Sequence, residues 1–313
     1  MGGSHVPEVL ELRHGDHRAT VHTTGAALGS LTREGRDLVW PYERRPEAFQ
    51  GQVLAPWPNR VGGARYRFEG DEYRLAVTEP GTGAALHGLV HDVVWEPLAV
   101  AGHEVRLGTD LRGGEGYPFP LRLEIGYRLD EAGLTVTTEA ANTGTDTAPF
   151  GLGFHPYLTL GAPLRDLAAR DAAHLSVPAR TYQPADDRLL PVGDPVPVEG
   201  GVFDLRPPGR AMGGTVLDTA FTGLERDGDG RAWVWLSGPD HRVGLWCDRS
   251  FGWLQLFSAD TLDGGDRRAH LAVEPMTCPP DAFNSGTGLI RLAPGERTRH
   301  TFGITSAGFG TPS

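Results

Sequence analysis

A glutamate and a histidine in strand-like segments of this chain could move protons during a reaction. Glu274 follows the apolar run Leu271–Val273 and precedes Pro275, so we expect its carboxylate at a strand end, among apolar neighbours. Desolvation raises the pKa of such a carboxyl group and suits it to accept a proton near neutral pH. His155 follows Phe154 in a segment too short for a helix, and an imidazole is the usual proton donor in this pH range. Spacing alone leaves two alternatives open, a glutamate paired with an arginine and a histidine bonded to the backbone.

Five more polar residues lie beside glycine, proline or aromatic residues and could bind a polar ligand. They are Asn59 and Arg60 after a Pro-Trp-Pro segment, His87 before a glycine, Asp218 in Asp-Thr-Ala-Phe, and Gln255 between two aromatic residues on one strand face. Other roles are equally open for them. Asp218 could cap a turn, Arg60 could pair with a surface acid, and Gln255 could pack in the core.

The sequence favours chemistry without a metal or a cofactor. His87 and His91 have the spacing of a zinc-binding helix, but Gly88 and Val93–Trp95 favour a strand, where this spacing builds no helical ligand face. All 29 basic residues are arginines, which excludes a lysine Schiff base and pyridoxal phosphate anchored in that way. Cys278 stands among prolines without a cysteine-protease signature, so we interpret it as a buried thiol.

Strands must position these residues, because period-2 alternation is the dominant pattern. The clearest case has apolar residues at every second position from Leu121 to Leu129, a turn at Asp130 to Gly133, and a second strand with Leu134 and Val136. The same pattern predicts hairpins around residues 69–72, with apolar positions continuing to Val77, and around 238–240, and a further strand over 253–258. No convincing helix of ten residues is found, although residues 165–174 could form a short helical turn.

Composition bounds the fold and the partners. With 44 glycines and 25 prolines in 313 residues, the chain suits many short strands, and we expect one domain over residues 1–313 with an all-β, large antiparallel β-sandwich fold. The Pro/Gly-rich segment 183–214 is interpreted as an elaborated loop. The net charge of −11 argues against nucleic acid as a partner, and no 18-residue apolar run predicts a membrane span. Two cysteines and the absence of a signal-like N-terminal segment favour a cytoplasmic protein.

In this order, the polar clusters together resemble the aldose 1-epimerase (galactose mutarotase-like) family. The most specific piece is the segment from Glu274 to Asn284, with the sequence Glu-Pro-Met-Thr-Cys-Pro-Pro-Asp-Ala-Phe-Asn, and the match extends from about Gly51 to Ile304. The Pro-Trp-Pro-Asn-Arg segment resembles a bacterial subgroup of that family, and Phe154–Leu160 departs from the Asn-His-x-Tyr-Phe-Asn-Leu stretch of its best-known members. The sugar therefore stays open between glucose, galactose and a modified hexose.

The resemblance implies a β-supersandwich and a function. The chain would interconvert the α and β anomers of a free aldose, a monosaccharide substrate, with Glu274 as base and His155 as acid. The family's sugar-binding residues fall on Asn59, Arg60, His87, Asp218 and Gln255, and no metal or other cofactor is expected. A monomer and a homodimer are both compatible with the sequence.

Three other functions remain possible at this stage. A non-catalytic carbohydrate-binding protein would keep Arg60 and Asp218 but has no need of the Glu274 and His155 pair. A glycoside hydrolase would use Asp218 and Glu274 as its two carboxylates. A mutarotase for a phosphorylated or otherwise modified hexose would need extra cations at the cleft, which the many arginines could supply.

Overall fold

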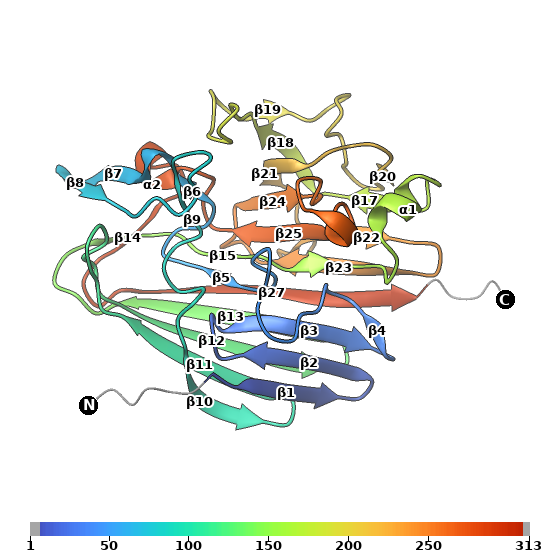
Figure 1. Cartoon of the computed structure of the whole chain (residues 1–313), viewed down its shortest axis with the longest axis horizontal. Helices are drawn as coiled ribbons and strands as arrows, with labels where there is room; N and C mark the ends of the chain where they lie inside the picture. The colour runs from blue at the N-terminus through green and yellow to red at the C-terminus, as the bar shows by residue number, and fades with distance from the viewer. Residues whose placement is uncertain (1–6, 309–313) are drawn as a thin grey trace.

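Antiparallel sheets make up most of the protein. The computed structural model describes residues 7–308. Figure 1 shows long strands across the lower half of the molecule and shorter, more irregular ones above them. Within the described residues the helices are short: α1 (Leu164–Ala168), α2 (Ala282–Ser285) and the 3₁₀ turns η1 (Gly62–Ala64) and η2 (Gly264–Asp266). No helix of the described chain is long and apolar enough to cross a membrane.

Three sheets carry the architecture. The N-terminal sheet has the order β1 (Val9–His14), β2 (His17–His22), β3 (Ala27–Arg33), β4 (Arg36–Asp37). The long-strand sheet has the order β10 (Glu96–Ala101), β11 (Glu104–Leu111), β12 (Leu121–Asp130), β13 (Gly133–Asn142), β27 (Arg297–Gly308), β23 (His241–Cys247), β22 (Ala232–Ser237), β17 (His174–Ser176), β20 (Arg210–Ala211). The site sheet has the order β19 (Val196–Pro197), β18 (Ala179–Gln183), β21 (Asp218–Leu224), β24 (Trp253–Phe257), β25 (Leu271–Met276), β15 (Gly153–Phe154), β5 (Val53–Leu54), and β16 (Tyr157–Leu158) also pairs with β25.

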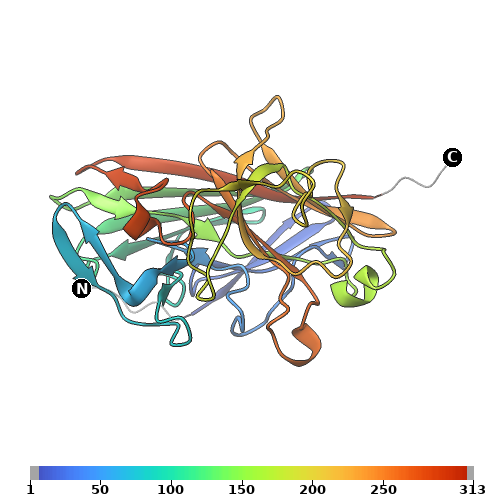
Figure 2. The same cartoon turned by 90° about the horizontal axis from the view of Figure 1, so that it is seen from above.

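Three short pairs complete the strands. They are β6 (Arg60–Val61) with β9 (Ala85–Leu86), β7 (Arg65–Phe68) with β8 (Asp71–Arg74), and β14 (Ala148–Phe150) with β26 (Ile290–Leu292). Figure 2, turned by 90°, shows β13 and β27 side by side along the length of the molecule, as their pairing requires. The arrangement confirms the expected large antiparallel β-sandwich.

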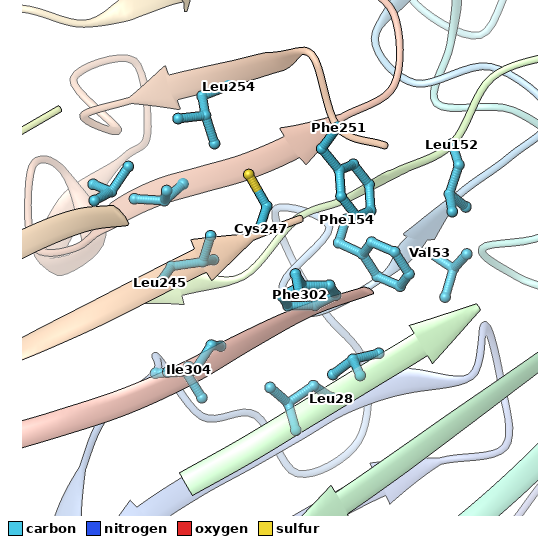
Figure 3. Packing of buried hydrophobic residues seen from close by; sticks show 14 of the residues in the cluster. Leu28, Val53, Leu152, Phe154, Leu245, Cys247, Phe251, Leu254, Phe302 and Ile304 are labelled. Carbon is cyan, nitrogen blue, oxygen red and sulfur yellow. The ribbon is translucent and has the colours of Figure 1, made fainter. Parts of the chain in front are cut away.

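The main core lies between the sheets and follows from the alternation in the sequence. Along β12, every second side chain from Leu121 to Leu129 is buried, while those between them are more accessible. Figure 3 shows Phe154 of the site sheet pointing toward Phe302 of the long-strand sheet, with Phe251 beside them. The Phe154 and Phe302 rings lie 4.6 Å apart between centroids. Neighbouring side chains of a strand point to opposite faces. The strands of the site sheet therefore direct every second residue into the core and the residues between them to the other face.

Several strand boundaries differ from the sequence prediction. β25 continues through Pro275 to Met276, so Glu274 lies inside a strand and the expectation of a strand end was wrong. Pro275 is tolerated because β25 changes its neighbour here, from β16 at Ala272 to β15 at Met276. β8 ends at Arg74, because the next residue across the hairpin, Ala64, belongs to η1 and has a positive φ of 49°, although it still accepts the backbone N–H of Leu75.

Two loop predictions also need correction. Residues 87–94 form turns and isolated bridges at Gly88 and Val94, and not the strand expected there. The excursion from residue 183 to 214 begins inside β18 and contains the two short strands β19 and β20. The predicted helical turn is α1, one residue earlier than expected.

Candidate active site

The site sheet brings His155 and Glu274 together as a cross-strand pair. Gly153 pairs with Met276 and Tyr157 with Ala272, so His155, two residues from each end, lies opposite Glu274. The Nε2 atom of His155 is 3.4 Å from Oε1 of Glu274. Both side chains are buried, with 5% and 2% of their residue surface exposed.

The same row continues across the sheet through three more strands. Glu274 pairs with Gln255 on β24, Gln255 with Ala220 on β21, and Ala220 with Gln183 on β18. On β21, β24 and β25, residues next to the row point into the core, as Phe221, Leu254 and Val273 do, so the row belongs to the opposite face, here called the site face. Cross-strand register therefore places His155, Glu274 and a buried amide side by side.

Asp218 joins this row through Gln255. The amide Nε2 of Gln255 donates to Oδ1 of Asp218 at 2.6 Å. Burial raises the pKa of Asp218 above its ordinary value, while the positive charge of Arg60 and the hydrogen bond from Gln255 act in the opposite direction. A carboxylate fixed in this way can accept hydrogen bonds from sugar hydroxyl groups.

Asn59, Arg60 and His87 come from two loops joined by the β6–β9 pair. The backbone N–H of Asn59 donates to Nδ1 of His87 at 3.2 Å, and the backbone N–H of His87 donates to the carbonyl of Asn59 at 2.9 Å. This leaves Nε2 as the protonated nitrogen of a neutral His87. Both Asn59 and His87 have positive φ angles, 56° and 62°, and Gly88 packs so closely that a Cβ there would lie 2.1 Å from the Ala55 carbonyl oxygen. The loop backbone is thus tightly constrained beside the site.

His87 and Phe49 complete the contacts around the pair of His155 and Glu274. The His87 ring meets the His155 ring edge to face, with centroids 5.3 Å apart. Phe49 contacts His87 at 4.6 Å and His155 at 6.1 Å between ring centroids, and its φ of 59° is unusual for an aromatic residue. Tyr157 stacks on the other side of His155 at 5.0 Å. The imidazole of His155 is therefore held between aromatic rings.

Glu79 is a site residue that sequence reasoning missed. It binds Arg60 through two parallel hydrogen bonds, from Nε to Oε2 at 2.6 Å and from Nη2 to Oε1 at 2.7 Å, and Thr82 donates a further bond to Oε2. The geometry fixes the guanidinium group and neutralises its charge. The only local signal was a turn at Glu79-Pro80-Gly81, which says nothing about a partner 19 residues away.

Burial shifts the pKa values of Glu274, His155 and His87. It raises the pKa of Glu274 well above the usual value, with the nearby carboxyl of Asp218 acting in the same direction. It lowers the pKa of His155 to about 3 and that of His87 well below 6.5. Among buried side-chain atoms of the described chain, Oε2 of Glu274, Nδ1 of His155 and Oε1 of Gln255 have no hydrogen-bond partner. Buried polar groups without partners are costly, and they are often found where a ligand binds.

The candidate residues also contain one set of possible metal ligands. Ligand atoms of His87, His155 and Glu274 all lie within 4.8 Å of one another, whereas His91, the partner suggested by sequence spacing, is not in this set. Two imidazoles and a carboxylate are a donor set that zinc accepts. All seven residues proposed from the sequence lie on the site face or in the two loops beside it. Cys278 is fully buried with its pKa raised to about 12, as a structural thiol would be.

Comparison with known proteins shows which family, relatives and solved structure this chain is similar to. The sequence model of the family described as Aldose 1-epimerase matches residues 8–305. The uncharacterized protein YihR of Escherichia coli (strain K12) is 34% identical over 304 residues, which cover 95% of this chain and 92% of that protein. Galactose mutarotase of Homo sapiens is 32% identical over 198 residues, 59% of this chain and 55% of that protein. The structure of the GalM/aldose epimerase homologue from Caenorhabditis elegans has the same fold, with a TM-score of 0.85 at 19% identity, covering 97% of this chain and 99% of the other.

Proposed function

The chain belongs to the aldose 1-epimerase family, and from this premise we propose that it is a mutarotase acting on a free hexose. The observation that carries the proposal is the buried pair of His155 and Glu274, 3.4 Å apart on the site face. One oxygen of the carboxyl group faces the imidazole and the other has no partner within the described residues. Such a pair suits a reaction that moves two protons at neighbouring oxygens of one substrate.

Interconversion of anomers needs only acid-base chemistry. Glu274 takes the proton from the hydroxyl group on C1 while His155 gives one to the ring oxygen, so the bond between C1 and the ring oxygen breaks and an aldehyde forms. Rotation about the bond between C1 and C2 presents the other face of the aldehyde. Closure then reverses both transfers, and the enzyme returns to its starting protonation state.

The pKa shifts define how many protons the pair carries. Burial raises the pKa of Glu274 and lowers that of His155, so it favours the neutral form of both groups, in which the pair holds one proton on the carboxyl group. Transfer of this proton to the imidazole creates the base and the acid together. Both arrangements have the same charge, so substrate contacts, and not bulk pH, decide between them.

Neighbouring groups favour a neutral sugar. Asn59, His87, Asp218 and Gln255 offer the donors and acceptors that hydroxyl groups use. Arg60 is the cation of this set, and its charge is already paired with Glu79. A phosphate would have to compete with that carboxylate, which favours an uncharged hexose over a phosphorylated one.

Polarimetry tests the proposal. Freshly dissolved α-glucose, β-glucose and α-galactose should each reach their equilibrium rotation faster with the protein than in matched buffer, after subtraction of the spontaneous rate. A methyl glycoside cannot open its ring, so its rotation should stay constant; its hydrolysis would instead identify a glycosidase. Binding of glucose without any acceleration would identify a carbohydrate-binding protein. Acceleration for hexose 6-phosphates alone would identify a mutarotase for phosphorylated sugars.

A further inference from the structure

A loop that follows the catalytic row closes one end of the site. The row from His155 through Glu274, Gln255 and Ala220 ends at Gln183, the last residue of β18. With about 4.8 Å between neighbouring strands, Gln183 lies roughly 14 Å along the sheet from Glu274. The chain leaves the sheet at this point as the loop 184–192, in the yellow-green region beside β18 in Figure 1.

The loop is internally fixed by its own polar groups. The amide Nε2 of Gln183 donates to the carbonyls of Pro184, Val192 and Gly193 at 3.1, 3.3 and 3.0 Å, which ties the two ends together. At the tip, Oδ1 of Asp186 accepts the backbone N–H groups of Arg188 and Leu190. A β-bridge joins Ala185 to Pro191 between these two points. These contacts therefore hold the loop in one conformation.

Apolar residues of this loop face the sugar-binding groups. A cavity of about 20 Å³ is lined on one side by Asn59, Arg60, Asp218 and Gln255, and on the other by Gln183, Ala185, Leu189 and Pro191. A cavity of this size holds about one water molecule, whereas sites for small ligands measure roughly 300 Å³ or more. A Cβ added to Gly62 would lie 3.0 Å from a methyl carbon of Leu190, so the loop also packs close to the segment after Arg60. The site is closed at this end in the structure.

We propose that loop 184–192 is a specificity-determining wall, which lies against the C2 side of a bound sugar and selects substrates without a substituent at O2. The inference rests on the proposed function, because it requires C1 to lie at Glu274 and His155. With the ring oxygen at His155 and the C1 hydroxyl group at Glu274, the sugar follows the row from its ring oxygen to C1, so C2 is the next carbon toward the loop. A second sugar attached at O2 occupies the space of Leu189.

The test compares glucose with sophorose, whose reducing glucose carries a second glucose at O2. Mutarotation is measured by polarimetry for the wild type and for the double variant Leu189→Ala/Leu190→Ala, which shortens the wall. A single methylene in a specificity pocket is worth roughly 10-fold or more in kcat/KM. The ratio of kcat/KM for sophorose to that for glucose should therefore rise by about 10-fold or more in the double variant.

A second variant and a matched control make the outcome decisive. Leu189→Trp enlarges the wall and should lower kcat/KM for glucose by at least about 10-fold. Val192→Ala, on the same loop but 52% exposed and outside the cavity lining, should leave both sugars unchanged. An unchanged sugar ratio in the double variant overturns the proposal, and so does full glucose activity of Leu189→Trp.

Failure of the two proposals can be told apart. If the wild type accelerates glucose mutarotation but the loop variants do not change selectivity, only the wall is wrong. If the wild type accelerates no sugar, the proposed reaction is wrong, and calorimetric binding of glucose and sophorose to the same variants then tests the wall. Equal changes in affinity for both sugars would then refute it.

Discussion

The substitution Glu274→Gln tests whether the carboxyl group of Glu274 is catalytic or only structural. Glutamine keeps the size of the side chain and its reach to His155, but it cannot accept a proton from the sugar. The free Oε2 atom is the acceptor that the variant loses. General acid-base catalysis contributes roughly 10²- to 10⁴-fold, so kcat should fall by that factor, which corresponds to about 2.7 to 5.4 kcal/mol in the barrier.

The same substitution should stabilise the folded protein at neutral pH. Burial raises the pKa of Glu274 in the folded state above its value in the unfolded chain. The folded state therefore holds this proton more tightly, and stability is lost as pH rises from the unfolded pKa through the folded one. Glutamine does not ionise, so the variant does not lose this stability as pH rises. The variant should melt roughly 2 °C higher for each kcal/mol recovered at pH 7, and the gain should shrink as pH falls toward about 4.3, the ordinary glutamate pKa.

Polarimetry and thermal melting followed by circular dichroism at pH 4.5 and 7 measure both effects. Glu124→Gln is the matched control, because it makes the same chemical change at a surface ion pair, between Glu124 on β12 and Arg106 on β11. Surface pairs contribute about 0 to 1 kcal/mol, so its activity should equal that of the wild type. A folded Glu274→Gln variant that keeps activity within about threefold, short of the general-base effect, would refute the catalytic role. A lower melting temperature at pH 7 would show that Glu274 is a structural partner of His155.

Four further outcomes are expected. Arg60→Ala should raise KM with little change in kcat, measured by initial rates, because a fixed guanidinium group binds the ground and transition states alike; a collapse of kcat at constant KM would contradict this. Cys278→Ser should keep most of its activity, since burial raises the pKa of this thiol to about 12 and leaves no thiolate to act; a hundredfold loss in a folded variant would contradict this. Dialysis against EDTA should leave the rate unchanged, because His87, His155 and Glu274 are proposed to act on protons; loss of activity restored by zinc would make their cluster a metal site. The profile of kcat/KM against pH should fall in acid, as His155 with its pKa of about 3 takes a second proton, and fall in base above the raised pKa of Glu274, as the pair loses its single proton; a rate that rises steadily into alkaline solution would contradict this.

The sequence predicted the parts of the fold that depend on local alternation. Every second residue from Leu121 to Leu129 is buried, and the strand at Trp253 carries Gln255 on the site face, as period 2 requires. The sequence could not show that Pro275 continues a strand, because that depends on β25 changing its neighbour at this residue. Local patterns report a residue's own strand and not the pairing around it.

The site shows the same limit. Seven candidate residues came from motifs, but Glu79 and the loop at Leu189 had no comparable signal. Their importance comes from contact with Arg60 and Asp218, which are distant in the chain. The protonation of His155 was also missed, since a pKa of about 3 follows from complete burial and not from its sequence neighbours.

The row of residues across the site sheet determines which kinds of change this protein can tolerate. A deletion of one residue between Leu271 and Glu274 would shift the register of the strand, turning the carboxyl group into the core and Val273 toward the sugar. The strands can therefore change by substitution but not in length. The loop 184–192 has no such constraint beyond its closing bonds at Gln183, and insertions in surface loops cost little. New substrate preferences can arise there by changes in length, while the acid-base pair stays in register.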